Sequence, residues 1–460
     1  MRYISTRGGV SPITFSEAVM MGLATDGGLL IPEKLPTIDT ETLRRWATLS
    51  YQELAYEVMH PFVAGEIPDA ELRQLVDNAY ASFDHDEITP VVKLGEQHIL
   101  ELFHGPTLAF KDVALQFLGN VFEYLLTRDG GHLNIVGATS GDTGSAAIHG
   151  VRGKKGIHIF ILHPHGRVSP VQERQMTTVL DENVHNIAVR GNFDDGQRIV
   201  KTLFNDLEFK KEYRLGAVNS INWCRILAQI VYYFRAWAVV TKGDTNQKVS
   251  FSVPTGNFGD IFAGYLAKQM GLPVDKLVLA TNRNDILSRF VNSGQYSAGE
   301  VSPTITPSMD IQVSSNFERY LFDLLGRDGD AVQACMKDMQ EKGAFTVSDA
   351  QRDAVQSIFE AAAVSEEQTL ATIAEAYKEH GYVLDPHTAV GVAAAKEIPG
   401  CICLATAHPA KFGDAVKEAT GKAAPLPPSM ENLMELPTRL EVLDATPEAI
   451  KGKLAETLKA

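Results

Sequence analysis

The chain has 460 residues, with 42 Lys and Arg against 57 Asp and Glu, which gives a formal charge of −15 at pH 7. Hydrophobic residues make up 45% of it and charged residues 22%, a balance typical of a folded protein and not of a disordered one. The acidic balance argues against a broad nucleic-acid-binding surface, although it permits a local pocket for one small anion. The length predicts two or three domains.

The first 95 residues predict a mostly helical domain with several Pro and Gly breaks. Apolar residues recur at helical spacing over segments 41–63 and 69–82. The N-terminal residues 1–7 lack the apolar stretch of a signal peptide. No run in the chain approaches the roughly 20 apolar residues of a membrane span, so we expect no membrane association.

From residue 96 onward, short apolar segments rich in β-branched residues alternate with amphipathic helical patterns. The predicted strands are 133–138, 157–163, 184–189, 249–253, 277–281 and 401–407. This alternation indicates an α/β architecture with mostly parallel sheets over residues 96–423. Helical spacing dominates residues 312–380, and residues 424–460 predict a helical tail after a proline-rich start.

Four cysteines are too few for a disulfide framework in a chain of this length. Cys401 and Cys403 are the one close pair, and the pattern places both thiols on one face of a buried strand. A zinc site needs a second pair of ligands, which is not evident, so we predict no metal site. The cysteine content is typical of a reduced, cytoplasmic protein.

Lys111 lies at the start of a predicted helix, directly after the segment His104-Gly-Pro-Thr-Leu-Ala-Phe110. A helix start is an unfavourable place for a cation, because the helix dipole is positive there. One interpretation is that Lys111 simply points into water. The other is that its amine has a lowered pKa, which would suit it to form a Schiff base with an aldehyde.

A first loop rich in Gly, Ser and Thr, residues 139–145 (TSGDTGS), follows a predicted strand and opens a predicted helix. Free backbone N–H groups and hydroxyls at such a place are typical of an anion site for a carboxylate or a phosphate. The alternative is an ordinary turn in which Asp142 or Thr143 caps the helix.

A second loop, residues 254–260 (PTGNFGD), also joins a predicted strand to a predicted helix. Gly256 and Gly259 permit the close backbone approach that a phosphate cradle requires. The loop is neither a P-loop nor the GxGxxG dinucleotide motif. Together with Lys111, the two loops favour a cofactor with both an aldehyde and a phosphate, which describes pyridoxal phosphate, and leave one anion loop for a substrate carboxylate.

These segments resemble those of threonine synthases, a family of fold-type II pyridoxal-phosphate enzymes. The matching segments are HGPTLAFKD (104–112), TSGDTG (139–144), GNFGD (256–260), TAHPAKF (406–412) and, near the N-terminus, FSEAVMMGLATDGGLLIP (15–32). The resemblance implies two α/β lobes of mostly parallel sheet with the cofactor between them in residues 96–423. It also implies a small N-terminal domain in residues 1–95, followed at the far end by the tail 424–460.

The resemblance implies conversion of O-phospho-L-homoserine and water to L-threonine and phosphate, the last step of threonine biosynthesis. Lys111 would hold pyridoxal 5′-phosphate and move protons. The residues against the cofactor phosphate would be Gly256, Asn257, Phe258, Gly259 and Asp260. Thr406 would hydrogen-bond the pyridine nitrogen, with Asp142 also beside the cofactor. The residues around the substrate carboxylate would be Ser140, Asp142, Thr143 and Gly144.

Lys411 is the first candidate to hold the substrate phosphate, followed by Arg167 and Arg225, although each could instead be a solvated cation.

Two other functions stay open. One is a different lyase of the same cofactor class, such as a threonine dehydratase or a phosphohomoserine phospho-lyase; the N-terminal segment and TAHPAKF count against a dehydratase. The other is a non-catalytic binding protein, which the intact Lys111 and loops disfavour. The sequence predicts no particular oligomeric state.

Overall fold

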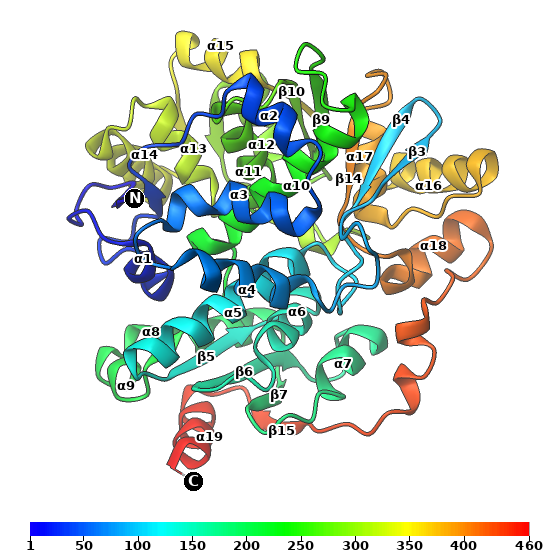
Figure 1. Cartoon of the computed structure of the whole chain (residues 1–460). Helices are drawn as coiled ribbons and strands as arrows, with labels where there is room; N and C mark the ends of the chain where they lie inside the picture. Colours follow the sequence, from blue (N-terminus) through cyan, green and yellow to red (C-terminus); the bar gives the residue numbers. More distant parts are fainter. Residues whose placement is uncertain (460) are drawn as a thin grey trace.

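A computed structural model describes residues 1–459 of the chain. Two large β-sheets form its framework. Each sheet with its helices makes one α/β lobe, and the two lobes lie one above the other in Figure 1. The predicted α/β class with mostly parallel sheets is confirmed. Within residues 1–459, no helix combines the length and the apolar character that crossing a membrane requires.

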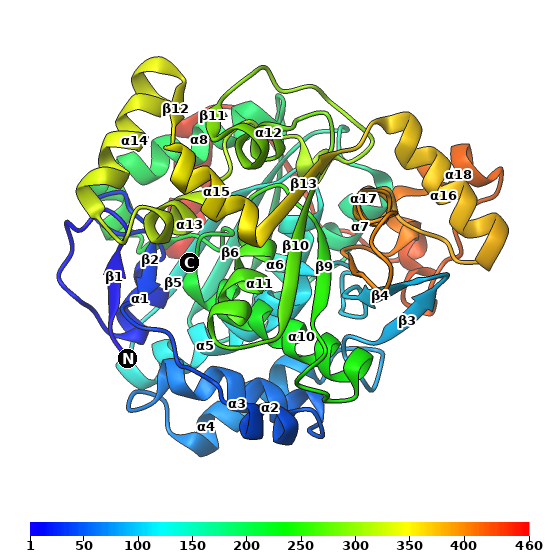
Figure 2. The same ribbon diagram turned by 90° about the horizontal axis from the view of Figure 1, so that it is seen from above.

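The N-terminal region is mostly helical and covers the backs of two central helices. Its elements are β1 (Tyr3–Ser5), α1 (Phe15–Met21), β2 (Leu30–Pro32), α2 (Thr40–Trp46), α3 (Tyr51–Val63) and α4 (Asp69–Tyr80). β1 and β2 pair antiparallel, and the side chains of Thr14, Asp39 and Ser50 cap α1, α2 and α3. α4 packs against α5 (Lys111–Asp129) and α3 against α10 (Trp223–Thr241), the two helices that begin at the site described below (Figure 2).

The upper lobe in Figure 1 contains a six-stranded sheet in the order β13-β10-β9-β14-β4-β3. Its strands are β3 (Val91–Leu94), β4 (Gln97–Glu101), β9 (Val249–Pro254), β10 (Val274–Thr281), β13 (Phe359–Ala363) and β14 (Ile402–Ala405). All neighbours are parallel except β3 and β4. The further elements of this part of the chain are α11 (Gly259–Gln269), α12 (Ile286–Ser293), β11 (Gln295–Ser297), α13 (Phe317–Leu324), α14 (Gly329–Lys342), β12 (Ala344–Thr346), α15 (Asp349–Ile358), α16 (Glu366–His380), α17 (Pro386–Ala394) and α18 (Gly413–Thr420).

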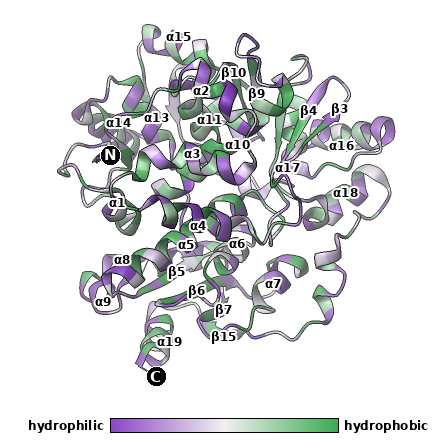
Figure 3. Ribbon diagram, viewed as in Figure 1, coloured by the Kyte–Doolittle hydropathy of each residue, from purple (hydrophilic) through white to green (hydrophobic). Residues whose placement is uncertain are grey.

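The lower lobe contains a parallel five-stranded sheet in the order β15-β7-β6-β5-β8. Its strands are β5 (Leu133–Ala138), β6 (Ile157–Pro164), β7 (Val184–Arg190), β8 (Leu215–Gly216) and β15 (Glu441–Asp444). Its remaining helices are α6 (Asp142–Val151), α7 (Pro170–Thr177), α8 (Phe193–Asn205), α9 (Leu207–Glu212) and α19 (Pro447–Lys459). Hydrophobic residues concentrate in the strands and the central helices, whereas outer helices such as α14 are hydrophilic (Figure 3).

The structure contains strands that the sequence did not predict, among them β3 and β4, and two further segments contradict the predicted helices. Residues 312–380, predicted as helical, also contain β12 and β13. β13 has the sequence Phe-Glu-Ala-Ala-Ala, in which alanine favours helix, but it pairs in parallel with Leu277–Thr281 of β10. The tail 424–460 contributes β15, which pairs in parallel with β7, before its helix begins. In both segments, pairing with a distant strand overrides the local preference.

The helices α5 and α6 touch through two glycines, and this close approach brings the beginnings of both helices to one place. A Cβ added at Gly119 would overlap the carbonyl oxygen of Gly150, and one at Gly150 would lie 2.6 Å from the carbonyl oxygen of Leu115. We therefore expect Gly119→Ala to lower the free energy of unfolding by about 1–3 kcal/mol, because the helices must move apart. Urea denaturation would measure the change.

Gly452 on α19 is the matched control, because nothing lies within 4 Å of a Cβ added there. Gly452→Ala is expected to raise stability by about 0.5–1 kcal/mol through helix propensity alone. Equal effects of the two substitutions would contradict the packing argument.

Candidate active site

The predicted site segments meet where the strands of the upper sheet end. β14 and β9 are neighbours, with Ile402 opposite Phe251, so the segments that follow them leave the sheet side by side. The chain after β14 also lies against the segment before α5, since the Phe110 N–H donates to the Thr406 carbonyl over 2.8 Å. Thr406 is therefore buried next to the beginning of α5, where Lys111 is the first helical residue.

Lys111, Asp142 and Lys411 form a buried cluster between the two lobes. The Nζ of Lys411 lies 2.8 Å from Oδ1 of Asp142, and the Nζ of Lys111 lies 3.7 Å from Oδ2. Gln172 of α7 donates to Oδ1 of Asp142 over 2.8 Å. Two interpretations left open by the sequence are wrong: Lys111 does not point into water, and neither Asp142 nor Thr143 is the N-cap residue of α6, because Gly141 occupies that position.

The environment shifts the pKa values of the cluster in opposite directions. Burial lowers the pKa of Lys111, the positive charges of Lys411 and Arg225 lower it further, and Asp142 only partly offsets them. Burial alone would raise the pKa of Asp142, but Lys411 and Lys111 outweigh it and hold that pKa well below its usual range. The site therefore contains a stable carboxylate beside an amine that gives up its proton more easily than a free lysine.

The loop before Lys111 is fixed by Asp112, a residue to which the sequence analysis assigned no role. Asp112 accepts hydrogen bonds from the backbone N–H and the hydroxyl of Thr107, over 2.8 and 2.7 Å. Burial raises the pKa of Asp112 to about 6 despite these bonds. The Thr107 carbonyl in turn accepts from Nζ of Lys411 over 2.6 Å and from Gln175 over 3.1 Å. Asp112 thus positions the loop on which Lys411 rests.

The loop after β9 presents a row of free backbone donors. Phe258 has φ 62°, in the left-handed region, and α11 begins at the next residue. Within residues 1–459, the N–H groups of Asn257, Phe258, Gly259 and Asp260 have no acceptor. Successive free N–H groups at a helix start form a cradle for a phosphate.

Asp260 and Gly256 of this loop have roles in the packing of the protein itself. The carboxylate of Asp260 accepts hydrogen bonds from the hydroxyls of Tyr232 and Tyr233, over 2.5 and 2.9 Å, so Asp260 offers the cradle only its backbone N–H. A Cβ at Gly256 would lie 2.7 Å from the carbonyl oxygen of Ser308. Glycine is required there by a neighbouring segment of the chain, in addition to any ligand.

Arg225 lies in the first turn of α10 with its side chain buried, and it forms no ion pair within residues 1–459. One guanidinium nitrogen donates to the Val218 carbonyl over 2.9 Å, while Nε is buried without an acceptor. Burial lowers the pKa of Arg225 to about 10. An unpaired buried cation next to Lys111 is suited to bind an anionic ligand.

The structure does not bring all the predicted residues into this cluster. At the beginning of α6, Gly144 is buried, Thr143 is half-buried and Ser140 is exposed. Arg167 is exposed after β6 and makes no hydrogen bond with the cluster in the described part of the chain. Lys411 is in the cluster, but two donors of its ammonium already bond Asp142 and the Thr107 carbonyl.

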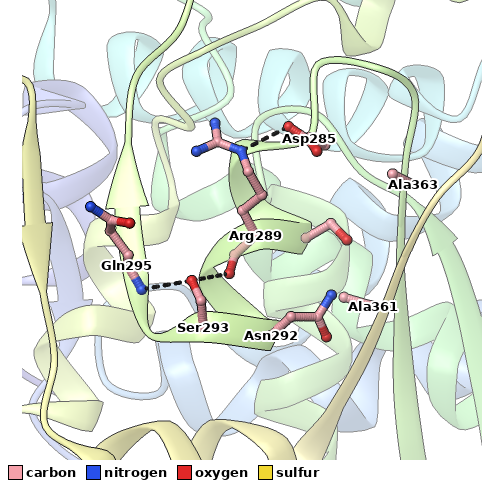
Figure 4. A pocket seen from close by; sticks show the side chains of 8 residues that line it. Asp285, Arg289, Asn292, Ser293, Gln295, Ala361 and Ala363 are labelled. Carbon is pink, nitrogen blue, oxygen red and sulfur yellow. Dashed lines mark hydrogen bonds and ion pairs between the residues drawn. The ribbon is translucent and has the colours of Figure 1, made fainter.

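A separate hollow of about 430 Å³ lies between α12 and the outer edge of β13 (Figure 4). Its lining includes Asp285, Arg289 and Ala363. The Arg289 guanidinium is already bonded to Asp285 over 2.8 Å and to the Ser297 hydroxyl over 2.7 Å. This hollow therefore does not offer an unpaired cation as the Lys111 cluster does.

The parts of the cluster fit pyridoxal phosphate. The buried Lys111 can hold an aldehyde, the free N–H groups of the loop after β9 can hold a phosphate, and Thr406 can face a ring nitrogen between them. Two α/β lobes with such a site between them define a fold-type II pyridoxal-phosphate enzyme.

Comparison with known proteins narrows this class to one family. Three family profiles match the chain: "Threonine synthase N terminus" over residues 2–80, "Pyridoxal-phosphate dependent enzyme" over 84–341 and "Threonine synthase, C-terminal" over 388–453. Threonine synthase of Pseudomonas aeruginosa is 52% identical, over 96% of each chain, and that of Saccharomyces cerevisiae is 47% identical, over 99% of this chain and 98% of the yeast chain. The crystal structure of pyridoxal-phosphate-bound threonine synthase from Brucella melitensis superposes with a TM-score of 0.97, 48% identity and full coverage of both chains. The chain belongs to the threonine synthase family.

Proposed function

We propose that the chain converts O-phospho-L-homoserine and water to L-threonine and phosphate with pyridoxal phosphate as cofactor. The observation that carries the proposal is the position of Lys111, a buried amine with a lowered pKa, between the Asp142 carboxylate and the unpaired cation Arg225. Membership of the threonine synthase family supports it. A substrate with a carboxylate and a phosphate matches the excess of buried positive charge.

Bound pyridoxal phosphate acts as an electron sink that lets protons leave carbons near the substrate amine. Lys111 would hold the cofactor, and its amine would be free to move protons once the substrate amine is bound. Its amine then removes the Cα proton and returns protons later, for which a pKa near the working pH is best. The burial and neighbouring cations that lower the pKa of Lys111 therefore serve this step.

The other residues bind and orient. The N–H groups of Asn257 through Asp260 hold the cofactor phosphate, and the Thr406 hydroxyl meets the pyridine nitrogen without adding a negative charge. Asp142 balances the charges of Lys111 and Lys411, and Lys411 keeps Asp142 ionised. The beginning of α6, with Ser140, Thr143 and Gly144, takes the substrate carboxylate. The Gly144 N–H already donates to the Thr139 hydroxyl over 2.9 Å, so the donors come from Ser140 and Thr143.

We assign the substrate phosphate to Arg225 ahead of Lys411 and Arg167, because its guanidinium is buried near Lys111 and forms no ion pair within residues 1–459. Arg225→Met is expected to raise KM for phosphohomoserine about ten- to hundredfold, since a charge-assisted hydrogen bond contributes about 1.5–3 kcal/mol. Steady-state kinetics at saturating pyridoxal phosphate would measure the change.

Arg235 on the same helix is the matched control, since its guanidinium donates to the Leu49 carbonyl of the N-terminal region. Arg235→Met is expected to leave KM within about twofold. An unchanged KM in Arg225→Met would remove Arg225 from the substrate-phosphate site and return Lys411 to first place.

Incubation of the purified protein with phosphohomoserine, assayed for phosphate, threonine and ketobutyrate, tests the function. We expect equal amounts of phosphate and threonine. Ketobutyrate in place of threonine would indicate the alternative lyase, and the absence of all three products would indicate a binding protein.

The four cysteines are unpaired, which supports the proposal that the enzyme acts in a reducing compartment such as the cytoplasm.

A further inference from the structure

The segment that begins α13 lies directly against the proposed cofactor-phosphate loop. The backbone N–H and the side-chain amide of Asn316 both donate to the Asn257 carbonyl, over 3.0 and 3.1 Å. The hydroxyl of Ser314 donates to the Gly256 carbonyl over 2.8 Å. The carbonyls of Gly256 and Asn257 are thus held by this segment, while the N–H groups of residues 257–260 have no acceptor within residues 1–459.

Arg319, in the first turn of α13, connects Asn316 to two distant parts of the chain. Its side chain is fully buried, and it forms no ion pair within residues 1–459. The guanidinium donates to Oδ1 of Asn316 over 2.5 Å and to the Ile221 carbonyl over 2.6 Å. It also donates twice to the carbonyl of Leu30 in β2, over 3.0 and 2.8 Å. In Figure 2, β2 lies beside α13.

The chemistry of these groups permits only one orientation of the Asn316 amide. A guanidinium is a donor only, so it must face the amide oxygen of Asn316. The amide nitrogen then faces the carbonyls of Asn257 and Ser220, where it donates. Arg319 therefore determines which way Asn316 holds the loop.

We propose that Arg319 is a positioning residue for the cofactor-phosphate loop, through which the N-terminal strand β2 stabilises the phosphate cradle. The proposal rests on the proposed function, because it takes the loop after β9 as the phosphate site. The contact path runs from the Leu30 carbonyl through Arg319 and Asn316 to the Asn257 carbonyl.

The neighbouring Glu318 supplies a matched control. It also ties α13 to the N-terminal region, through an ion pair with Arg7 at 2.9 Å and a hydrogen bond from Thr6 at 2.7 Å. It is not bonded to Asn316 or to the phosphate loop in the described part of the chain. Glu318→Gln therefore weakens the same contact between the two regions and keeps each hydrogen bond of the path from Leu30 through Arg319 and Asn316 to Asn257.

The test starts from purified protein from which the cofactor has been removed. Absorbance titration measures how tightly it binds pyridoxal phosphate, and phosphorus NMR measures the chemical shift of the bound phosphate. Arg319→Lys keeps the charge but loses the planar fork of donors. We expect it to weaken binding tenfold or more and to move the NMR shift. Asn316→Ala should weaken binding and move the NMR shift in the same way. Because both residues act on one path, the variant with both substitutions should bind pyridoxal phosphate no more weakly than the single variant that binds it more weakly. Glu318→Gln should bind within threefold of the unsubstituted chain, even if its melting temperature falls.

Normal binding and an unmoved NMR shift in folded Arg319→Lys would overturn the proposal, as would equal weakening by Glu318→Gln. If Arg319→Lys does not fold, Asn316→Ala decides in its place, and normal binding there would overturn the proposal. Failure of the unsubstituted chain to bind pyridoxal phosphate is a different result, because it would overturn the proposed function itself.

Discussion

Lys111→Ala is expected to abolish threonine formation while the protein remains folded. Lys111 is the proposed attachment point of the cofactor and the proposed base, and loss of a positioned base alone costs about 10²–10⁴-fold in rate. The substitution also removes a buried cation whose pKa is lowered by its surroundings, so the fold loses little. Turnover with phosphohomoserine, circular dichroism and the absorbance band of bound cofactor would be measured on the same sample.

Lys154 is the matched control for this substitution, because it is a half-buried lysine that contacts the middle of α5, away from the site. Its Nζ donates to Oδ1 of Asn120 over 2.8 Å, far along the helix from Lys111. Lys154→Ala is expected to keep both turnover and the absorbance band. Substantial threonine formation by Lys111→Ala would refute the assigned role of Lys111.

Asp142→Asn is expected to lower both stability and turnover. The carboxylate is the counter-ion of Lys411 at 2.8 Å and of Lys111 at 3.7 Å, and all three side chains are largely buried. Removing one partner of a buried pair leaves an uncompensated charge, which costs about 3–5 kcal/mol. Without the carboxylate, the pKa of Lys111 should fall further, because Asp142 is its main opposing influence.

The effect of Asp142 on stability should depend on pH in a definite direction. Its folded pKa lies below the ordinary value of about 4, so the stabilisation is fully present above that value. It is lost as pH falls toward the folded pKa. The part of the stability difference between the unsubstituted chain and Asp142→Asn that comes from the Asp142 charge should therefore shrink as the pH falls from about 4 toward the folded pKa. Urea denaturation across this range would measure it.

The exposed pair of Lys396 and Glu375, 3.0 Å apart, is the control for burial. Glu375→Gln is expected to change stability far less than Asp142→Asn, because solvent screens this pair. An equally small effect of Asp142→Asn would contradict the role of Asp142 as a buried counter-ion.

Sequence patterns predicted the parts of the fold that local chemistry determines. The strands at β5 and β7 begin where predicted, and Lys111 is the first residue of its helix. These elements have strong apolar periodicity and clear turn residues. β13 was missed because its alanines favour a helix locally, and only the neighbouring strand β10 makes it extended.

In the site, too, local sequence predicts some residues, whereas tertiary packing determines the others. The motifs point to Lys111 and to the loop after β9, because each lies where a recognisable turn leads into a helix. The partners of these residues are determined by tertiary packing, so no spacing indicates them. Gln172 reaches Asp142 from another helix, and Asp260 turns its carboxylate to the tyrosines of α10 instead of the cradle. The Asp112 contact with Thr107 is local, and an acidic residue in the first turn of a helix was its available signal.

The central claim is that Lys111 carries the cofactor in a buried, positively charged site of an acidic protein. Borohydride reduction of the purified holoenzyme, followed by proteolysis and mass spectrometry, tests it most directly, because reduction makes the lysine–cofactor bond permanent. We predict one pyridoxyl-phosphate adduct per chain, on the peptide that contains Lys111. An adduct on Lys411 or any other lysine, with Lys111 unmodified, would contradict the account.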